Sequence, residues 1–361
     1  MDIFFNNILS NGSIIASPSK EPDYNYHWMR DSAIVMKAIM TLYIDTKDIN
    51  QQNKLIDIMN KYIDIELIHI NHHPAEPKFE IDGSPYLGDW GRPQNDGPAL
   101  RGLVCIKLLS YLPERQKDLH KIISNDINYT LSVLDDPSFD LWEEQDGFHL
   151  YTRLLQAKFI NDCFKVNYQS SYDLDNMLIR ITELVSHHFS LDGKIYSSFN
   201  KNGHVLREYD SSVLLALCHI DYQIPTYVEK TLNISLHTFK NYANEMVKEF
   251  TEIYPVNNIL KIPFLGRYYE DKYFDGNPWI ISTIAYFHYQ QQINNLSSVV
   301  KEFKTFFHFL KDIKKMDLPE QIDKYDANNI SVEKLTWNYS ELILFFKDLK
   351  KMDITEMISI F

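Results

Sequence analysis

The chain has 361 residues, 45% of them hydrophobic, and a formal net charge of -13 at pH 7. This acidic balance argues against a nucleic-acid partner, because no basic stripe is available to neutralise phosphates. No run of about 18 apolar residues occurs, so no membrane span is predicted. Residues 1–7 lack the features of a signal peptide. We therefore expect a cytoplasmic protein, one exported by another route, or a trimmed secreted form.

The cysteine, histidine and aromatic residues indicate which bonds, ions and ligands the protein is expected to have. Cys105, Cys163 and Cys218 are far apart in apolar stretches, which predicts buried free thiols. The pairs His72–His73 and His187–His188 are poorly placed to share one ion, so we predict no metal, and nothing indicates a cofactor. The chain has 23 Tyr, 21 Phe and 5 Trp, which suits a pocket for a neutral polar ligand such as a sugar.

Apolar residues recur every three or four positions along most of the chain, and alternating runs are scarce, which predicts an all-α protein. The helix that starts at Asp31 is expected to carry this acid at its cap. No Gly/Ser linker interrupts the chain, so we expect one domain over residues 1–361, in a monomer. The predicted helices cover residues 2–9, 31–46, 48–69, 98–111, 114–134, 149–165, 171–190, 210–219, 235–250, 277–291, 294–314, 338–349 and 353–360.

Long loops rich in Trp, Tyr, Arg and Asp alternate with short polar ones, which suggests helical hairpins whose long loops gather at one end. Function usually resides on such loops. One of them, Asp140-Leu141-Trp142-Glu143-Glu144, is either a solvated acidic loop or a site that keeps one carboxyl protonated. In another, Arg30-Asp31 is either a helix-capping pair or a fork for sugar hydroxyls. The long loops are residues 14–30, 76–98, 138–148, 263–279 and 318–337.

The five loops carry ASPS…PDYNYHWMRDS, GDWGRPQNDGPALRG, DLWEEQDG, GRYYEDKYFDGNPW and PEQID…LTWNYS, in this order, over residues 14–340. They resemble the glucoamylases of glycoside hydrolase family 15, in particular the eukaryotic type. The resemblance implies an (α/α)6 barrel, with the active site at the loop end of the inner helices. It also implies inverting release of glucose from non-reducing ends of α-1,4-glucans, with slower cleavage of α-1,6 links. We expect no β-sandwich domain and no starch-binding module beside the barrel, which favours soluble dextrins over raw starch.

The same resemblance assigns roles to residues. Glu143 is implied as the general acid and Glu320 as the general base, which in an inverting enzyme stand about 6.5–9.5 Å apart. We expect Asp140, Glu144 and Trp142 to raise the pKa of Glu143 as its neighbours. Glu144 would bind the leaving-side sugar and Asp140 would support the site. Leu141 would offer its carbonyl, and Lys78 would make a peripheral contact. The sugar-binding wall is expected to consist of Tyr24, Trp28, Arg30, Asp31, Trp90, Trp142, Arg267, Trp279 and Trp337.

Two other interpretations stay open. One is a related exo-glucosidase of the same fold, of the trehalase or glucodextranase type. The other is a non-catalytic glycan-binding protein, against which the presence of both Glu143 and Glu320 argues. The chain departs from the family pattern in its short segment before Ile14 and in Tyr269, which stands where many relatives have Pro.

Overall fold

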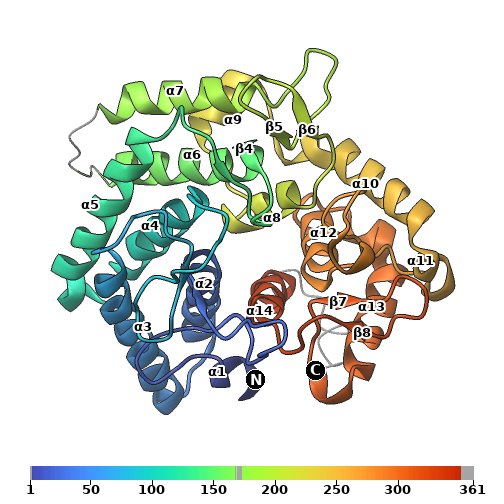
Figure 1. The fold of residues 1–361 in the computed structure, drawn as a ribbon, viewed down its shortest axis with the longest axis horizontal. Coiled ribbons are helices and arrows are strands. Elements are labelled where there is room, and N and C mark those ends of the chain that lie inside the picture. Colours follow the sequence, from blue (N-terminus) through green and yellow to red (C-terminus); the bar gives the residue numbers. More distant parts are fainter. Residues whose placement is uncertain (1, 167, 169–172, 351–361) are drawn as a thin grey trace.

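Six helices form a closed inner ring in the computed structural model, which describes residues 2–166, 168 and 173–350. Each of the six contacts the next one along the chain, and the last returns to contact the first, so that the ring closes (Figure 1). This ring is built from α2 (Met29–Asp45), α4 (Asp96–Leu108), α6 (Leu150–Lys165), α8 (Ser212–His219), α12 (Ile280–Gln292) and α14 (Thr336–Lys350).

An outer layer of helices surrounds the ring and connects its members (Figure 1). The longer outer helices are α3 (Ile49–His69), α5 (Gln116–Ser132), α7 (Leu174–Ser186), α10 (Lys240–Ile253) and α13 (Val300–Asp312). The shorter helices are α1 (Asp2–Asn6), α9 (Thr226–Leu232) and α11 (Pro255–Leu260). Most match predicted helices, whereas the helix predicted at 353–360 lies outside the described residues. Within the described ranges, no helix has the length and apolar content needed to cross a membrane.

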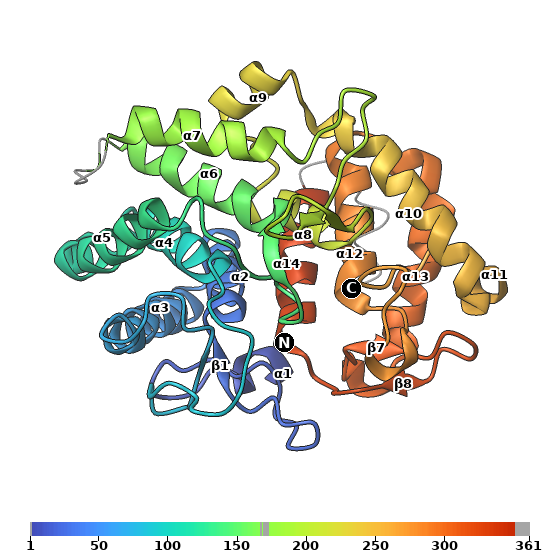
Figure 2. The same ribbon diagram turned by 45° about the horizontal axis from the view of Figure 1, so that its top comes forward.

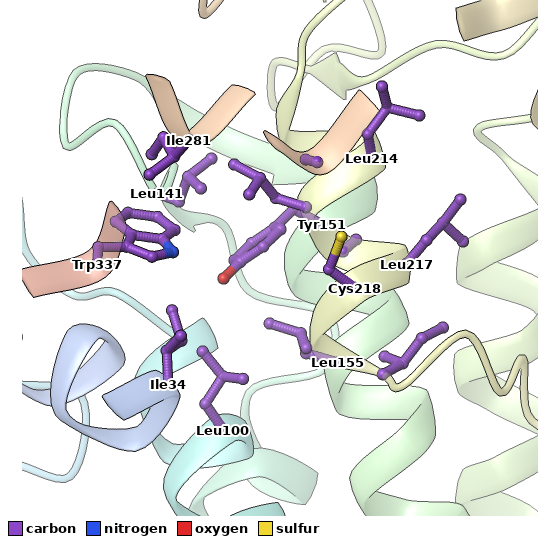
Figure 3. Packing of buried hydrophobic residues seen from close by; sticks show 14 of the residues in the cluster. Ile34, Leu100, Leu141, Tyr151, Leu155, Leu214, Leu217, Cys218, Ile281 and Trp337 are labelled. Carbon is purple, nitrogen blue, oxygen red and sulfur yellow. The ribbon is translucent and has the colours of Figure 1, made fainter. Parts of the chain in front are cut away.

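Burial differs between the two layers in the way that their sequences indicate. In the inner helix α12, every residue from Ile280 to Gln291 is buried. In the outer helix α13, only Phe303, Phe306, Phe307 and Leu310 are buried, at the spacing of a single helix face. The cysteines are buried and free, as predicted. Figure 3 shows side chains from all six inner helices meeting inside the ring, among them Ile34, Leu100, Tyr151, Leu214, Ile281 and Trp337.

Some elements differ from the prediction. The helix α2 begins at Met29, so Asp31 lies in its first turn, and the capping role expected of this residue was wrong. The helices α9 and α11 were not predicted, because 7 and 6 residues are too few to establish a helical period.

The structure also contains three small antiparallel sheets that the sequence did not predict. Their strands have only two to four residues, too few for an alternating pattern to appear. All three sheets lie in segments that precede inner helices, and they tie neighbouring segments together. The strands are β1 (His27–Trp28) with β2 (Lys78–Phe79), then β3 (Ser138–Phe139), β4 (Asp146–His149), β5 (Ser198–Phe199) and β6 (Val205–Arg207), and finally β7 (Gln321–Ile322) with β8 (Asn329–Ile330).

Candidate active site

The segments that precede the inner helices gather at one end of the ring, because inner and outer helices alternate along most of the chain. Figure 2 shows β1, β7 and β8 at this end, although β1 and β7 are separated by most of the sequence. A cavity of about 630 Å³ opens among these segments. Residues from all five predicted functional loops line it, so the expectation that these loops gather is confirmed.

The cavity brings together every predicted site residue except Asp140, which lies behind its wall. The predicted residues that line it are Tyr24, Trp28, Arg30, Asp31, Lys78, Trp90, Leu141, Trp142, Glu143, Glu144, Arg267, Trp279, Glu320 and Trp337. Tyr26, Tyr86 and Tyr273 line the cavity too and were not predicted, although they fall within the long loops. A single Tyr in a loop carries no signal that separates a ligand contact from ordinary packing.

The acidic stretch forms the tight turn between β3 and β4. The Asp140 carboxylate accepts hydrogen bonds from the backbone N–H groups of Glu144 (2.8 Å) and Gln145 (3.1 Å) and so fixes the turn. Asp140 exposes only 2% of its surface and the Glu143 side chain only 17%, whereas Glu144 is exposed, so the solvated-loop interpretation is wrong for Asp140 and Glu143. The backbone of Glu143 is left-handed, with φ +67°. This conformation directs the carboxylates of Glu143 and Glu144 to different partners.

One carboxylate oxygen of Glu143 receives three hydrogen bonds. Its Oε1 accepts from Trp28 Nε1 at 2.8 Å, from Arg30 Nη2 at 3.2 Å and from Gln94 Nε2 at 3.2 Å. Among the described residues none donates to Oε2, and the side chain keeps 17% of its surface exposed. Burial raises the pKa of Glu143, while the Arg30 guanidinium and the three hydrogen bonds oppose this shift.

Glu144 and Asp140 do not act on Glu143 as predicted, because two arginines hold them. Arg207 contacts Asp140 Oδ2 at 2.6 Å and Glu144 Oε2 at 3.1 Å. Arg267 contacts Glu144 Oε1 at 2.7 Å. The pKa of Glu143 is therefore raised by burial, an effect that an apolar neighbour such as Trp142 favours. The expectation was wrong only in the contribution it gave to the charges of Asp140 and Glu144.

Glu320 is held by neutral donors. Its Oε1 accepts from the Tyr24 hydroxyl at 2.9 Å, and its Oε2 accepts from Ser331 Oγ at 2.5 Å and from Gln321 Nε2 at 3.2 Å. The residue exposes 2% of its surface. Burial raises the pKa of Glu320, and the hydrogen bonds from Ser331, Tyr24 and Gln321 oppose this shift.

Several polar atoms at the cavity wall have no hydrogen-bond partner among the described residues. They include Asp31 Oδ2, Trp90 Nε1 and Trp279 Nε1. Burial raises the pKa of Asp31 to about 7, although the Arg30 guanidinium opposes the shift. A hydroxyl group can donate to the Asp31 oxygen and accept from the indole N–H groups, so these atoms are compatible with a ligand that carries hydroxyl groups.

The sequence profile of the family described as Glycosyl hydrolases family 15 matches residues 4–347. The chain belongs to this family. A probable glucoamylase of Schizosaccharomyces pombe is 30% identical over 93% of this chain and 84% of its own length. A glucoamylase of Blastobotrys adeninivorans is 32% identical over 78% of this chain, which spans only 51% of that relative. A solved glucoamylase structure from Saccharomycopsis fibuligera aligns with a TM-score of 0.82 at 22% identity, covering 97% of this chain and 93% of that one.

These findings confirm the predicted family and enzyme class, so the chain is a glycosyl hydrolase of family 15. They also confirm the predicted (α/α)6 barrel, since the chain shares its fold with solved family 15 glucoamylases.

One charged residue behind the family 15 cavity was missed entirely. Arg207, at the end of β6, also contacts Asp210 Oδ2 at 3.2 Å, and Asp210 in turn accepts from Trp142 Nε1 at 2.9 Å. This segment precedes the inner helix α8, whereas the five predicted loops precede the other five inner helices. It lies outside the five motifs, and its signal in the sequence is limited to three charged residues, Arg207, Glu208 and Asp210, shortly before an apolar helix.

One group of side chains in the described part of this family 15 chain is close enough to hold a metal ion: His27, Glu66 and His69. The backbone N–H of Ile14 donates to His27 Nδ1 at 3.0 Å, which puts the proton of the neutral ring on Nε2, facing Glu66. Arg101 also occupies Glu66 Oε2 at 3.0 Å. These contacts fit a buried ion-pair network, because a metal would need the lone pair that the His27 proton covers.

Proposed function

We propose that this family 15 hydrolase is a glucoamylase that releases β-D-glucose from non-reducing ends of α-1,4-glucans, with slower cleavage of α-1,6 links. The observation that carries the proposal is that Glu143 and Glu320, from segments 177 positions apart (320 − 143), line one cavity of about 630 Å³. The relatives that carry the name glucoamylase support the same activity.

The reaction needs one proton donor and one proton acceptor. Glu143 would give its proton to the glycosidic oxygen as the bond between that oxygen and C1 breaks. Glu320 would take a proton from a water whose oxygen bonds to C1 on the opposite face, which yields the β-anomer. The unoccupied Oε2 of Glu143 suits the first role. The Tyr24 hydroxyl, 2.9 Å from Glu320 Oε1, suits a role in placing the water.

The remaining wall residues would bind the sugar. Arg30 Nε lies 3.5 Å from Asp31 Oδ2. The two side chains are thus placed to hydrogen-bond adjacent hydroxyls of the terminal glucose, one as donor and the other as acceptor. Arg267 would also anchor the terminal sugar, and Glu144 would hold the sugar on the leaving side. The Trp142 indole packs against those of Trp279 and Trp337, and the three would exclude water from the reacting bond.

The direct test is incubation with maltose, isomaltose and trehalose while NMR follows the anomer of the released glucose. We expect maltose to react fastest, isomaltose slowly, and the β-anomer to appear first. Glucose that appears first as the α-anomer would contradict inversion. Fastest reaction with trehalose would favour the trehalase alternative, and sugar binding without any release of glucose would favour a non-catalytic protein. The Glu143→Gln variant, purified in the same way, controls for contaminating hydrolases.

A further inference from the structure

A lysine ammonium lies inside a box of aromatic rings at one side of the cavity. Lys78 stands opposite Trp28 in the β1–β2 ladder and exposes only 2% of its surface. Its Nζ lies 3.6 Å from the ring centroid of Trp90, 4.1 Å from those of Tyr26 and Tyr86, and 4.7 Å from that of Trp28. All four distances are within the range of about 6 Å in which a ring attracts a cation.

The four rings also contact one another in a closed cycle. Their centroids are 6.1 Å apart for Tyr26–Trp28, 5.9 Å for Trp28–Trp90, 5.8 Å for Trp90–Tyr86 and 5.2 Å for Tyr86–Tyr26. The interplanar angles run from 60° to 90°, so each pair meets edge to face. This arrangement encloses a central point, where the ammonium sits. We call these four rings the aromatic box.

The ammonium has few other partners. Among the described residues no carboxylate lies within 4 Å of Lys78 Nζ, whereas the buried Lys37 has Asp221 at 3.0 Å and the carbonyl of His219 at 2.7 Å. Burial lowers the pKa of Lys78 to about 8, with the charges of Glu143, Asp23 and Glu80 opposing the shift and that of Arg92 adding to it. A desolvated cation without a carboxylate needs another source of attraction, and the rings supply it.

The box connects directly to the candidate acid. The Trp28 indole is a wall of the box, and its Nε1 donates to Glu143 Oε1 at 2.8 Å. The Trp90 indole is another wall of the box and also lines the cavity. A change in the box would therefore move both a sugar-facing indole and a hydrogen-bond donor to Glu143.

We propose that Lys78 is a positioning residue whose ammonium is the internal ligand of the aromatic box. It holds Trp28 and Trp90 in place and, through Trp28, sets the orientation of the Glu143 carboxylate. This replaces the peripheral sugar contact expected for Lys78 from the sequence. The effect on turnover rests on the proposed function, whereas the state of the box in the substrate-free protein does not.

The first test compares Lys78→Met with the wild type and with Lys272→Met, which removes an exposed lysine that does not line the cavity. Loss of the cation should lower kcat/KM for maltose about tenfold, whereas Lys272→Met should leave it unchanged. The near-UV circular dichroism and the Trp28 indole N–H resonance of the substrate-free protein should change in Lys78→Met. A lysine that only binds sugar would leave these substrate-free signals as they are, and that result would overturn the proposal.

Chemical rescue provides a second test that requires a folded protein. Lys78→Ala lacks the last three methylenes and the ammonium, which together correspond to propylammonium. Added propylammonium should restore the substrate-free tryptophan signals and much of the activity, whereas 1-propanol should not. Equal rescue by both compounds, or no loss of the tryptophan signals in Lys78→Ala, would overturn the proposal.

Protonation supplies the third test. The wild-type tryptophan signals should titrate near pH 8 without unfolding, and those of Lys78→Met should not. Because the folded pKa lies below that of an unfolded lysine, the stability of the wild type relative to Lys78→Met should increase as pH rises above about 8. If the wild type hydrolyses none of the three sugars but shows these titrations, the proposed function is contradicted and the role of Lys78 in the aromatic box is supported. If the wild type hydrolyses maltose and Lys78→Met has the same rate and the same tryptophan signals, the role of Lys78 is contradicted and the proposed function is supported.

Discussion

The surroundings of Glu143 and Glu320 differ although both residues are acids at the wall of one cavity. Glu143 sits at a left-handed position in a tight turn and has a guanidinium, an indole and an amide on a single oxygen. Glu320 directly precedes the short strand β7 and has hydroxyl and amide donors on both oxygens, with no cation in hydrogen-bond contact among the described residues.

This difference suits the two proposed roles. An acid that delivers its proton to substrate needs a free oxygen, and Glu143 Oε2 receives no hydrogen bond from the described residues. A base that orients a water needs a fixed carboxylate, and donors on both oxygens fix Glu320. Burial raises the pKa of both, so the distinction between them lies in the geometry of their donors.

The largest expected effect comes from replacing each acid by its amide. Glu143→Gln and Glu320→Gln should each lower kcat for maltose by about 10²–10⁴-fold, because general acid–base catalysis supplies roughly that factor. α-D-Glucosyl fluoride separates the two roles, since fluoride leaves without a proton. Stopped assays with this substrate should show substantial turnover by Glu143→Gln and little by Glu320→Gln. The reverse order would exchange the roles of the two residues.

The next largest effect is a loss of stability on replacing Arg207, which pairs with Asp140 and Glu144, the acidic neighbours of Glu143. Arg207→Gln removes a buried cation, 4% exposed, from Asp140, Asp210 and Glu144. The free energy of unfolding should fall by about 3–5 kcal/mol, because uncompensated buried carboxylates remain. Urea titration measures this loss. The control is Arg180→Gln, whose pairs with Asp135 and Glu183 are exposed and should contribute no more than about 1 kcal/mol. Equal losses in the two variants would contradict a special role for Arg207.

Sequence reasoning singled out Glu143 and Glu320, which both line the cavity, because each lies in a contiguous motif beside other cavity residues. It missed Arg207, Ser331 and Tyr86 because their roles arise only when separate segments fold together. Arg207 reaches back 67 positions to Asp140, and Ser331 lies across the β7–β8 hairpin from Glu320. No local pattern of polar and apolar residues encodes such contacts.

The fold was more predictable than the electrostatics. Helices such as α12 and α13 have long apolar patterns, and their positions follow from the sequence with small shifts at the ends. The cause of the pKa shift at Glu143 does not follow, because adjacency along the chain suggested repulsion by Glu144. The left-handed backbone of Glu143 turns the two side chains to different partners, and only the folded turn reveals this.

A smaller effect is expected from the donors to Glu320. Ser331→Ala and Tyr24→Phe each remove one hydroxyl from the carboxylate and should lower kcat about tenfold, the scale of a hydrogen bond to a charged group. Both hydroxyls lower the pKa of Glu320, so their removal raises it. A base acts in its ionised form, and the acid limb of the kcat/KM profile should therefore move to higher pH. An unchanged acid limb in both variants would contradict the assignment of Glu320 as the base.

The smallest effect compares the free enzyme with its complex. Arg30 opposes the raised pKa of Glu143 in the free enzyme, where Glu143 still exposes 17% of its side chain. A bound glucose would draw on the Arg30 donors and bury Glu143 further, and both changes raise its pKa. The acid acts in its protonated form, so activity falls as pH rises through this pKa. The alkaline limb of kcat, which reports the complex, should therefore lie at higher pH than that of kcat/KM, which reports the free enzyme. A kcat limb at equal or lower pH would mean that the substrate neither weakens the Arg30–Glu143 contact nor buries Glu143 further.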